Sequence, residues 1–174
     1  MIQPVQTRRA HLSSAPMPLV RILVDGYSLL HAWPELARGK ARHSAAARDE
    51  LIHVLTQYRD ALRTPITVVF DGAGAPAGIT PQHSAPEMEV LYSRDGRSAD
   101  DLIERAAHRF QAYGEVLAVT DDYAVRDTVI GFGGMAASCD TFIAQVRTEL
   151  EALQSDLQNH NRRERSRFKA RART

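Results

Sequence analysis

Aspartates recur in this chain directly after short apolar runs, where a chemically active carboxylate could stand. Three runs with the composition of buried strands end in this way, and a segment with helical periodicity starts with two more acids. The strand-end residues are Asp25, Asp71, Asp121 and Asp122, and the helix-start residues are Asp100 and Asp101. The carboxyl ends of parallel strands meet at one edge of a sheet, which is where open α/β sheets place their sites. The sequence therefore predicts a cluster of carboxylates at that edge.

Converging carboxylates repel one another, and a bound divalent cation relieves the repulsion. Mg²⁺ and Mn²⁺ prefer oxygen ligands and keep water molecules in their coordination shell. Such an ion can activate water and neutralise the charge of a phosphodiester. A single Asp after a strand is usually a turn former or a helix cap, but three strand ends together with a helix start favour a metal site.

The two helix-start aspartates differ in the direction they face. With about 100° per residue, Asp100 lies roughly a quarter turn from the apolar stripe of the helix expected at residues 98–111. Asp101 lies roughly opposite that stripe and can form a capping box with Ser98. We therefore expect Asp100 to join the site and Asp101 to cap the helix and face solvent.

Strand and helix patterns alternate along residues 18–160. Strands are expected at 19–24, 66–70, 89–92 and 115–120. Helices are expected at 45–63 and 98–111, then as a short helix after Asp122 that ends at Ile130, and finally from Ser138 to about His160. Parallel neighbours need crossover connections, so this order predicts an α/β sandwich with a mainly parallel sheet. The last helix is expected to bury the stripe of Phe142, Val146, Leu150, Leu153 and Leu157.

Charge is distributed unevenly along the 174 residues. Residues 162–174 hold seven of the 22 lysines and arginines and one acid, a net charge of +6, so the remainder of this +1 chain carries −5. We divide the chain into a flexible leader at residues 1–17, one domain at 18–160, and a basic tail at 161–174. Basic tails often bind nucleic acid.

Several classes of function are excluded by composition. The single cysteine, Cys139, permits no intramolecular disulfide and no zinc site built from cysteines. No apolar run approaches the roughly 20 residues that a membrane span needs, and residues 1–17 do not have the pattern of a signal peptide. We expect a cytoplasmic protein that is not bound to a membrane.

Four motifs resemble the YacP-like group of NYN-domain proteins, within the wider PIN-like nuclease class. Residues 22–30 with Trp33 resemble V-D-G-Y-N followed by aliphatic residues and Trp, and residues 68–72 end in a matching F-D-G. Residues 98–104 resemble T-A-D-x-x-I-E, and residues 119–122 resemble V-T-S-D. The motifs occur in the family's order, over about residues 19–145.

The resemblance implies a PIN-like, three-layer α/β/α sandwich that cleaves single-stranded RNA with the help of Mg²⁺ or Mn²⁺. The RNA would be free or an mRNA on the ribosome. Carried over residue by residue, the catalytic and metal-binding acids are Asp25, Asp71, Asp100 and Asp122. The expected RNA contacts are Ser28, Arg94, Arg97, Arg162, Arg163, Arg165, Arg167 and Lys169.

Two departures from the family pattern favour an alternative function. Ser28 stands where the family usually has Asn, although its hydroxyl could still orient a carboxylate or a water. Ala136 stands where a basic residue is expected. The alternative is a non-catalytic RNA- or ribosome-binding adaptor with the same fold. A phosphotransfer protein is set aside, because Tyr27 stands where haloacid-type phosphatases need a second Asp.

Overall fold

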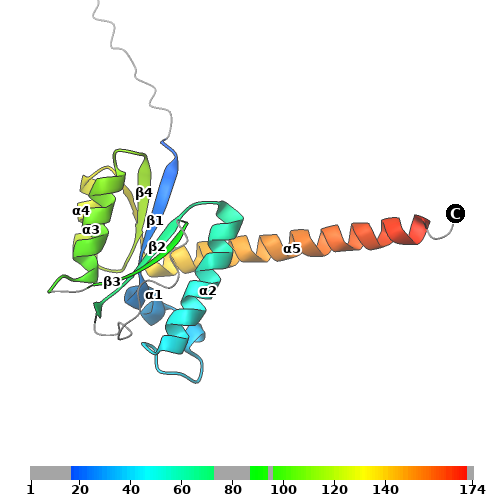
Figure 1. Cartoon of the computed structure of the whole chain (residues 1–174), viewed down its shortest axis with the longest axis horizontal. Coiled ribbons are helices and arrows are strands. Elements are labelled where there is room, and N and C mark those ends of the chain that lie inside the picture. Colours follow the sequence, from blue (N-terminus) through cyan, green and yellow to red (C-terminus); the bar gives the residue numbers. More distant parts are fainter. Residues whose placement is uncertain (1–16, 73–86, 94–95, 172–174) are drawn as a thin grey trace, which may run out of the picture.

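The computed structural model describes residues 17–72, 87–93 and 96–171, with side chains up to residue 163. Strands and helices alternate along most of its length (Figure 1). The elements are β1 (Leu19–Asp25), α1 (Gly26–Ala32), a 3₁₀ turn η1 (Pro34–Ala37), α2 (Ala45–Leu62), β2 (Ile66–Phe70), β3 (Met88–Tyr92), α3 (Ala99–Phe110), β4 (Glu115–Val119), α4 (Tyr123–Gly131), β5 (Met135–Ala137) and α5 (Cys139–Arg171).

The strands form one five-stranded sheet in the order β3-β2-β1-β4-β5, and every neighbouring pair is parallel. β1 lies at the centre, and all five residues of β2 are buried, as expected for strands covered on both faces. The chain adds strands on one side of β1 and then returns to add β4 and β5 on the other. The predicted three-layer α/β/α fold with a parallel sheet is confirmed.

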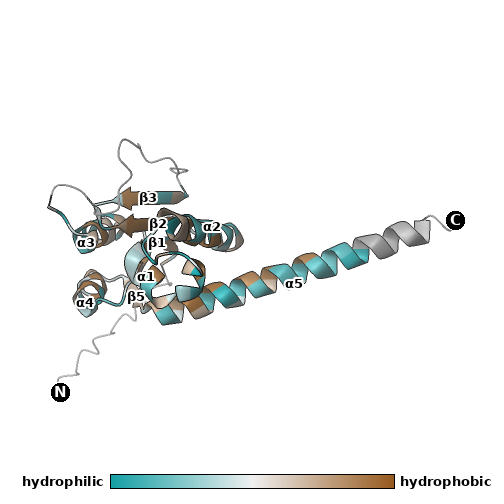
Figure 2. Cartoon of the chain, turned by 90° about the horizontal axis from the view of Figure 1, so that it is seen from below, coloured by the Kyte–Doolittle hydropathy of each residue, from teal (hydrophilic) through white to brown (hydrophobic). Residues whose placement is uncertain are grey.

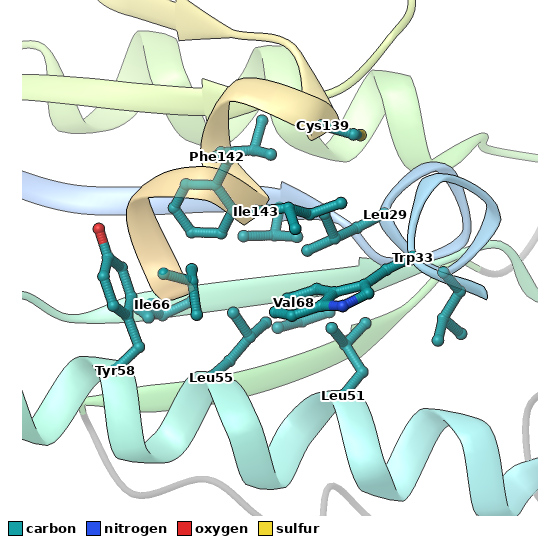
Figure 3. Close-up of a cluster of buried hydrophobic side chains, with 14 of the residues drawn as sticks. Leu29, Trp33, Leu51, Leu55, Tyr58, Ile66, Val68, Cys139, Phe142 and Ile143 are labelled. Atoms are coloured by element: carbon teal, nitrogen blue, oxygen red, sulfur yellow. The ribbon is translucent and has the colours of Figure 1, made fainter. Parts of the chain in front are cut away.

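Two hydrophobic cores lie on opposite faces of the sheet because alternate residues of a strand point to opposite sides. Ile22 and Val24 of β1 face a core that α1, α2 and α5 cover, drawn in Figure 3. Leu23 faces a smaller core covered by α3 and α4. Phe142 and Val146 at the start of α5 belong to the first core, so α5 is anchored there.

Local sequence explains where the longer helices begin. α2 starts after Ser44, whose hydroxyl accepts a hydrogen bond from the amide of Ala47. α3 starts after Ser98, and the expected capping box with Asp101 is present in both directions. These two helices match the predicted ranges to within one residue at each end.

Two of the short elements that the sequence patterns did not predict are α1 and β5. α1 has seven residues and β5 has three, both too short to show a clear period. α1 begins at Gly26, where a Cβ would collide with the ring of Phe70, so only glycine fits this close approach.

α5 is longer and less buried than predicted. It was expected to end near His160, but it continues to Arg171 and extends away from the domain (Figures 1 and 2). The segment after residue 150 contains no Gly or Pro and many good helix formers, so nothing stops the helix. Leu153 and Leu157 were expected to be buried, but they are 38% and 55% exposed because no other helix or strand of the described ranges covers them.

Three other expectations concern residues that fall partly or wholly outside the described ranges. Residues 1–16 of the expected leader, Arg94 of the expected RNA contacts, and residues 172–174 of the expected basic tail lie outside them. Among the helices of the described ranges, none is both long and apolar enough to span a membrane.

Candidate active site at the carboxyl edge of the sheet

The strand order reverses between β1 and β4, and acidic residues stand at the carboxyl ends of both strands. Asp25 is the last residue of β1, and Asp122 comes three residues after the end of β4. Ligands of open α/β sheets bind in the crevice at such a reversal. The two acids therefore flank the position where a site is expected.

Asp25 is fixed by four hydrogen bonds. Its Oδ1 accepts from the amides of Tyr27 and Ser28, both at 3.1 Å, so that it caps α1. Its Oδ2 accepts from Ser28 Oγ at 2.6 Å and from Thr120 Oγ1 at 3.3 Å. The carboxylate is thus held in one orientation by donors from two separate segments.

Asp122 is held in a similar way at the start of α4. Its Oδ1 accepts from the amides of Ala124 at 2.7 Å and Val125 at 3.2 Å. Its own amide donates to Thr120 Oγ1 at 3.1 Å. Thr120 therefore connects Asp122 with Asp25, although the sequence patterns assigned it no role.

Asp100 is half-buried at the start of α3, and its environment links it to both of these acids. Its pKa is raised above the ordinary value, first by burial and then by the negative charges of Asp25 and Asp122. Glu104, one helical turn further along, and Asp101 add smaller effects in the same direction. The charges of two predicted site acids, at the end of β1 and the start of α4, thus reach a third at the start of α3.

Asp101 has the different role expected of it. Its side chain accepts from the amide of Ser98 at 3.2 Å, and its own amide donates to Ser98 Oγ at 3.1 Å. It is exposed, whereas Asp100 is half-buried. The structure therefore distinguishes the two neighbours as the helical geometry predicted.

Asp71 follows β2 at the same sheet edge, but its hydrogen bonds connect it with the residue after β3 and not with Asp25 or Asp122. Its Oδ1 accepts from Ser93 Oγ at 2.6 Å and from the amide of Gly72 at 2.9 Å. The same Ser93 hydroxyl accepts from the Gly72 amide at 2.8 Å, and a Cβ on Gly72 would collide with the carbonyl oxygen of Ser93. Asp71 thus lies exposed at the rim, and Ser93 is a second supporting residue that sequence reasoning missed.

Asp121, which stands where the family usually has Ser, supports the start of α5. Its Oδ1 accepts from the amide of Cys139 at 2.9 Å. The thiol of Cys139 is fully buried, and burial followed by the charge of Asp121 raises its pKa. Cys139 is therefore a packing residue and not an activated nucleophile.

The carboxylate oxygens at this edge are of the type that Mg²⁺ and Mn²⁺ prefer, but their arrangement limits how many could bind one ion directly. Among the described residues, no three His, Cys, Asp or Glu side chains are arranged to hold one ion between them. Mg²⁺ usually binds proteins through only one or two carboxylates and keeps several waters. Binding of that kind would need only one or two of the predicted site acids as ligands, with waters in the remaining positions.

The predicted RNA contacts are scattered around this edge and along α5. Arg97 is exposed just before α3, while the hydroxyl of Ser28 is engaged with Asp25. Arg162 and Arg163 are exposed on α5. Arg165, Arg167 and Lys169 stand further along the same helix, with side chains outside the described part.

Known proteins share both the sequence motifs and the fold of this chain. A family model described as the YacP-like NYN domain matches residues 22–173. The chain belongs to this family. A relative from Bacillus subtilis (strain 168), named uncharacterized protein YacP, is 30% identical over 128 residues, which cover 73% of this chain and 75% of that protein.

Solved structures of a YacP protein agree with the fold. The crystal structure of Rae1 (YacP) from Bacillus subtilis aligns with a TM-score of 0.69 and 26% identity, over 81% of each chain. A mutant of that protein aligns with a TM-score of 0.67 and 26% identity, over 81% of this chain and 83% of the other. The PIN-like, nuclease-type fold of YacP-like NYN domains supports a role as an RNA-related nuclease or adaptor.

The hydroxyl of Ser28 is expected to contribute to activity through Asp25. Ser28→Ala removes the 2.6 Å bond to Asp25 Oδ2 and leaves Thr120 as the side-chain donor to that oxygen. For the metal-dependent ribonuclease that the resemblance implies, we expect Ser28→Ala to lower cleavage about 10- to 100-fold, as when supporting partners of metal ligands are removed from other proteins. Ser28→Asn, which restores the usual YacP-like residue, should retain more activity than the alanine variant. Equal activity of the wild type and Ser28→Ala in an RNA cleavage assay would contradict this role.

The raised pKa of Asp100 predicts a pH dependence of stability without metal. Because the folded state favours the protonated form, the free energy of unfolding should decrease as pH rises from about 4, the ordinary Asp range, to the raised pKa, and then level off. Asp100→Asn should lose this decrease and be more stable than the wild type at neutral pH. Urea unfolding at several pH values in EDTA measures this, and parallel curves for both proteins would contradict it.

Proposed function

We propose that the protein is a metal-dependent endoribonuclease that cleaves single-stranded RNA at the carboxyl edge of its sheet. The observation that carries this proposal is the environment of Asp100, whose pKa is raised by burial and then by the charges of Asp25 and Asp122 from two other elements. Carboxylates kept close at a strand-order reversal, at a cost in repulsion, indicate that a cation and an anionic substrate bind there.

Each side chain then has a defined task. Asp25 and Asp122 are held rigid by helix amides and by Thr120, so they present fixed oxygens to the site. Asp100 adds a third carboxylate from the first turn of α3, and Asp71 stands exposed at the rim, where the RNA would enter. Mg²⁺ or Mn²⁺ bound by these acids would supply an activated water and neutralise charge on the phosphate.

The basic end of α5 is proposed to attract the RNA. The body of the protein is acidic, so long-range attraction must come from residues 162–174, which carry +6. Such cations release counterions when they bind phosphates, which makes RNA affinity depend on salt. We expect this to occur in the cytoplasm, on RNA that is free or on the ribosome.

A non-catalytic RNA- or ribosome-binding adaptor is the second candidate. Two observations favour it: no described trio of acids is arranged to hold an ion, and the half-buried Ala136 of β5 stands where a basic residue was expected. An adaptor would bind RNA at the same edge and leave it intact.

A cleavage assay on purified protein separates the two candidates. Single-stranded RNA is incubated with EDTA, Mg²⁺ or Mn²⁺, and Asp25→Asn protein purified identically serves as the control. Cleavage that requires the metal and the Asp25 carboxylate supports the nuclease. RNA that is bound but stays intact supports the adaptor, and cleavage that persists in the control indicates a contaminant.

Removing residues 162–174 should weaken RNA binding without removing a catalytic acid. We expect a large decrease of affinity at low salt and a smaller slope of affinity against salt, by about 0.7 for each phosphate that is no longer neutralised. Cleavage at saturating RNA should change much less. Binding titrations at several salt concentrations test this, and an unchanged affinity and slope would show that these cations do not bind RNA.

A further inference from the structure

An aromatic side chain stands in solvent directly beside the carboxylate cluster. Tyr123 is the first residue of α4 and follows Asp122 in the chain. It is 77% exposed, and its Cα lies about 3.8 Å from that of Asp122 because the two are neighbours. An aromatic ring left in water at the edge of a site offers a flat apolar surface to a ligand.

A cation packs against this ring and holds it in place. The guanidinium carbon of Arg126, one helical turn further along α4, lies 4.2 Å from the centre of the Tyr123 ring. The Nε of Arg126 is buried and has no hydrogen-bond partner among the described residues, and its guanidinium lies over one face of the ring. With one ring face covered and the side chain 77% exposed, the other face is open.

We propose that the open face of Tyr123 stacks on an unpaired RNA base, next to the phosphate that the acids receive. This inference rests on the proposed function and adds the side chain that would hold an unpaired base of the RNA substrate beside the acids. Bases of single strands stack on aromatic rings and arginine planes, whatever their sequence. In a duplex, each base is already stacked and paired, so the ring has no free base to receive. The Arg126 cation beneath the ring also favours the neighbouring phosphates.

A second exposed tyrosine provides a matched control. Tyr113 is 72% exposed, and it stands between the end of α3 and the start of β4. It therefore lies at the amino-terminal edge of the sheet, opposite the acids. Replacing either tyrosine removes a ring of similar exposure, and only the removal of Tyr123 should affect a base at the site.

The test uses the full chain with Asp25→Asn, so that bound RNA is not cut. The probe is a single-stranded RNA of about ten nucleotides that carries the fluorescent base 2-aminopurine, alone or paired with its complement. We expect Tyr123→Ala to weaken single-strand binding about 5- to 100-fold and to abolish the stacking-induced quenching of 2-aminopurine. Tyr123→Phe should retain both, and Tyr113→Ala should change neither. Circular dichroism confirms that each variant is folded.

Unchanged affinity and quenching in Tyr123→Ala would overturn the inference. An equal loss of affinity in Tyr113→Ala would also overturn it, as would binding of the duplex as tightly as the single strand. The proposed nuclease activity is judged separately, with Asp25 restored. If no RNA is cleaved while binding depends on Tyr123, the nuclease proposal fails and the stacking site stands. If RNA is cleaved with the same KM by Tyr123→Ala and the wild type, only the stacking site fails.

Discussion

Replacing Asp25 by Asn should abolish RNA cleavage and leave the fold intact. Asp25 lies at the end of the central strand, and all four of its hydrogen-bond donors fix it toward the site. Removal of an indirect partner of a metal ligand typically costs 10- to 100-fold, so removing this carboxylate should cost more than about 100-fold. Asn caps helices about as well as Asp, so α1 should still form.

Asp122→Asn should likewise abolish RNA cleavage and leave the fold intact, because Asp122 flanks the same crevice as Asp25. It also keeps a capping side chain, here on α4, and it also removes one negative charge near Asp100. Both variants should unfold at the same urea concentration as the wild type in EDTA, or at a slightly higher one, because repulsion is reduced. Full cleavage activity in both would contradict the assignment of these acids.

Asp100→Asn and Asp101→Asn should differ strongly although the residues are adjacent. The Asp100 carboxyl interacts with the charges of Asp25 and Asp122, so its removal should reduce cleavage more than about 100-fold. Asp101 is exposed and belongs to the capping box, so Asp101→Asn should keep most of the activity. Its main cost should be to stability, at most about 0.5–2 kcal/mol, the range found when helix caps are removed.

Cleavage rates and urea unfolding measured on the same two preparations separate these effects. The pair is its own control, because each variant removes one charge from the same helical turn. A larger decrease of activity in Asp101→Asn than in Asp100→Asn would contradict the assignment of Asp100 to the site.

Much of the fold could be predicted because its long elements carry strong periodic patterns. Continuous apolar runs such as residues 66–70 can be buried on both faces only in a covered parallel sheet. α3 also begins at Ser98, whose capping role the sequence predicted. α1 and β5 were missed because seven and three residues are too few to show a period.

The exposed end of α5 could not be predicted for a different physical reason. Leu153 and Leu157 continue the spacing of Phe142 and Val146, and a periodic stripe shows which side of a helix is apolar. It does not show where the neighbouring element ends. Packing stops after Leu150, so the same pattern is buried at one end of the helix and exposed at the other.

The positions of the site acids were easier to predict than the residues that support them. Asp25 and Asp122 stand at strand ends, and Asp100 was separated from Asp101 by helical geometry alone. Thr120 and Ser93 act through contacts between distant segments, since Thr120 bonds to Asp25 95 residues away in the chain. No local pattern encodes such a pairing, so it emerges only once the strands are aligned.

The burial of Cys139 gives the protein a built-in reporter of local opening. It is the only cysteine, it is fully buried, and its raised pKa disfavours the reactive thiolate. A thiol-labelling reagent can therefore react only when the beginning of α5 separates from the sheet, a sub-global fluctuation with its own free energy. Asp121 joins this helix start to the loop that carries Asp122. The labelling rate of the unmodified protein thus measures how often this edge of the sheet opens, and a ligand that binds there would slow it.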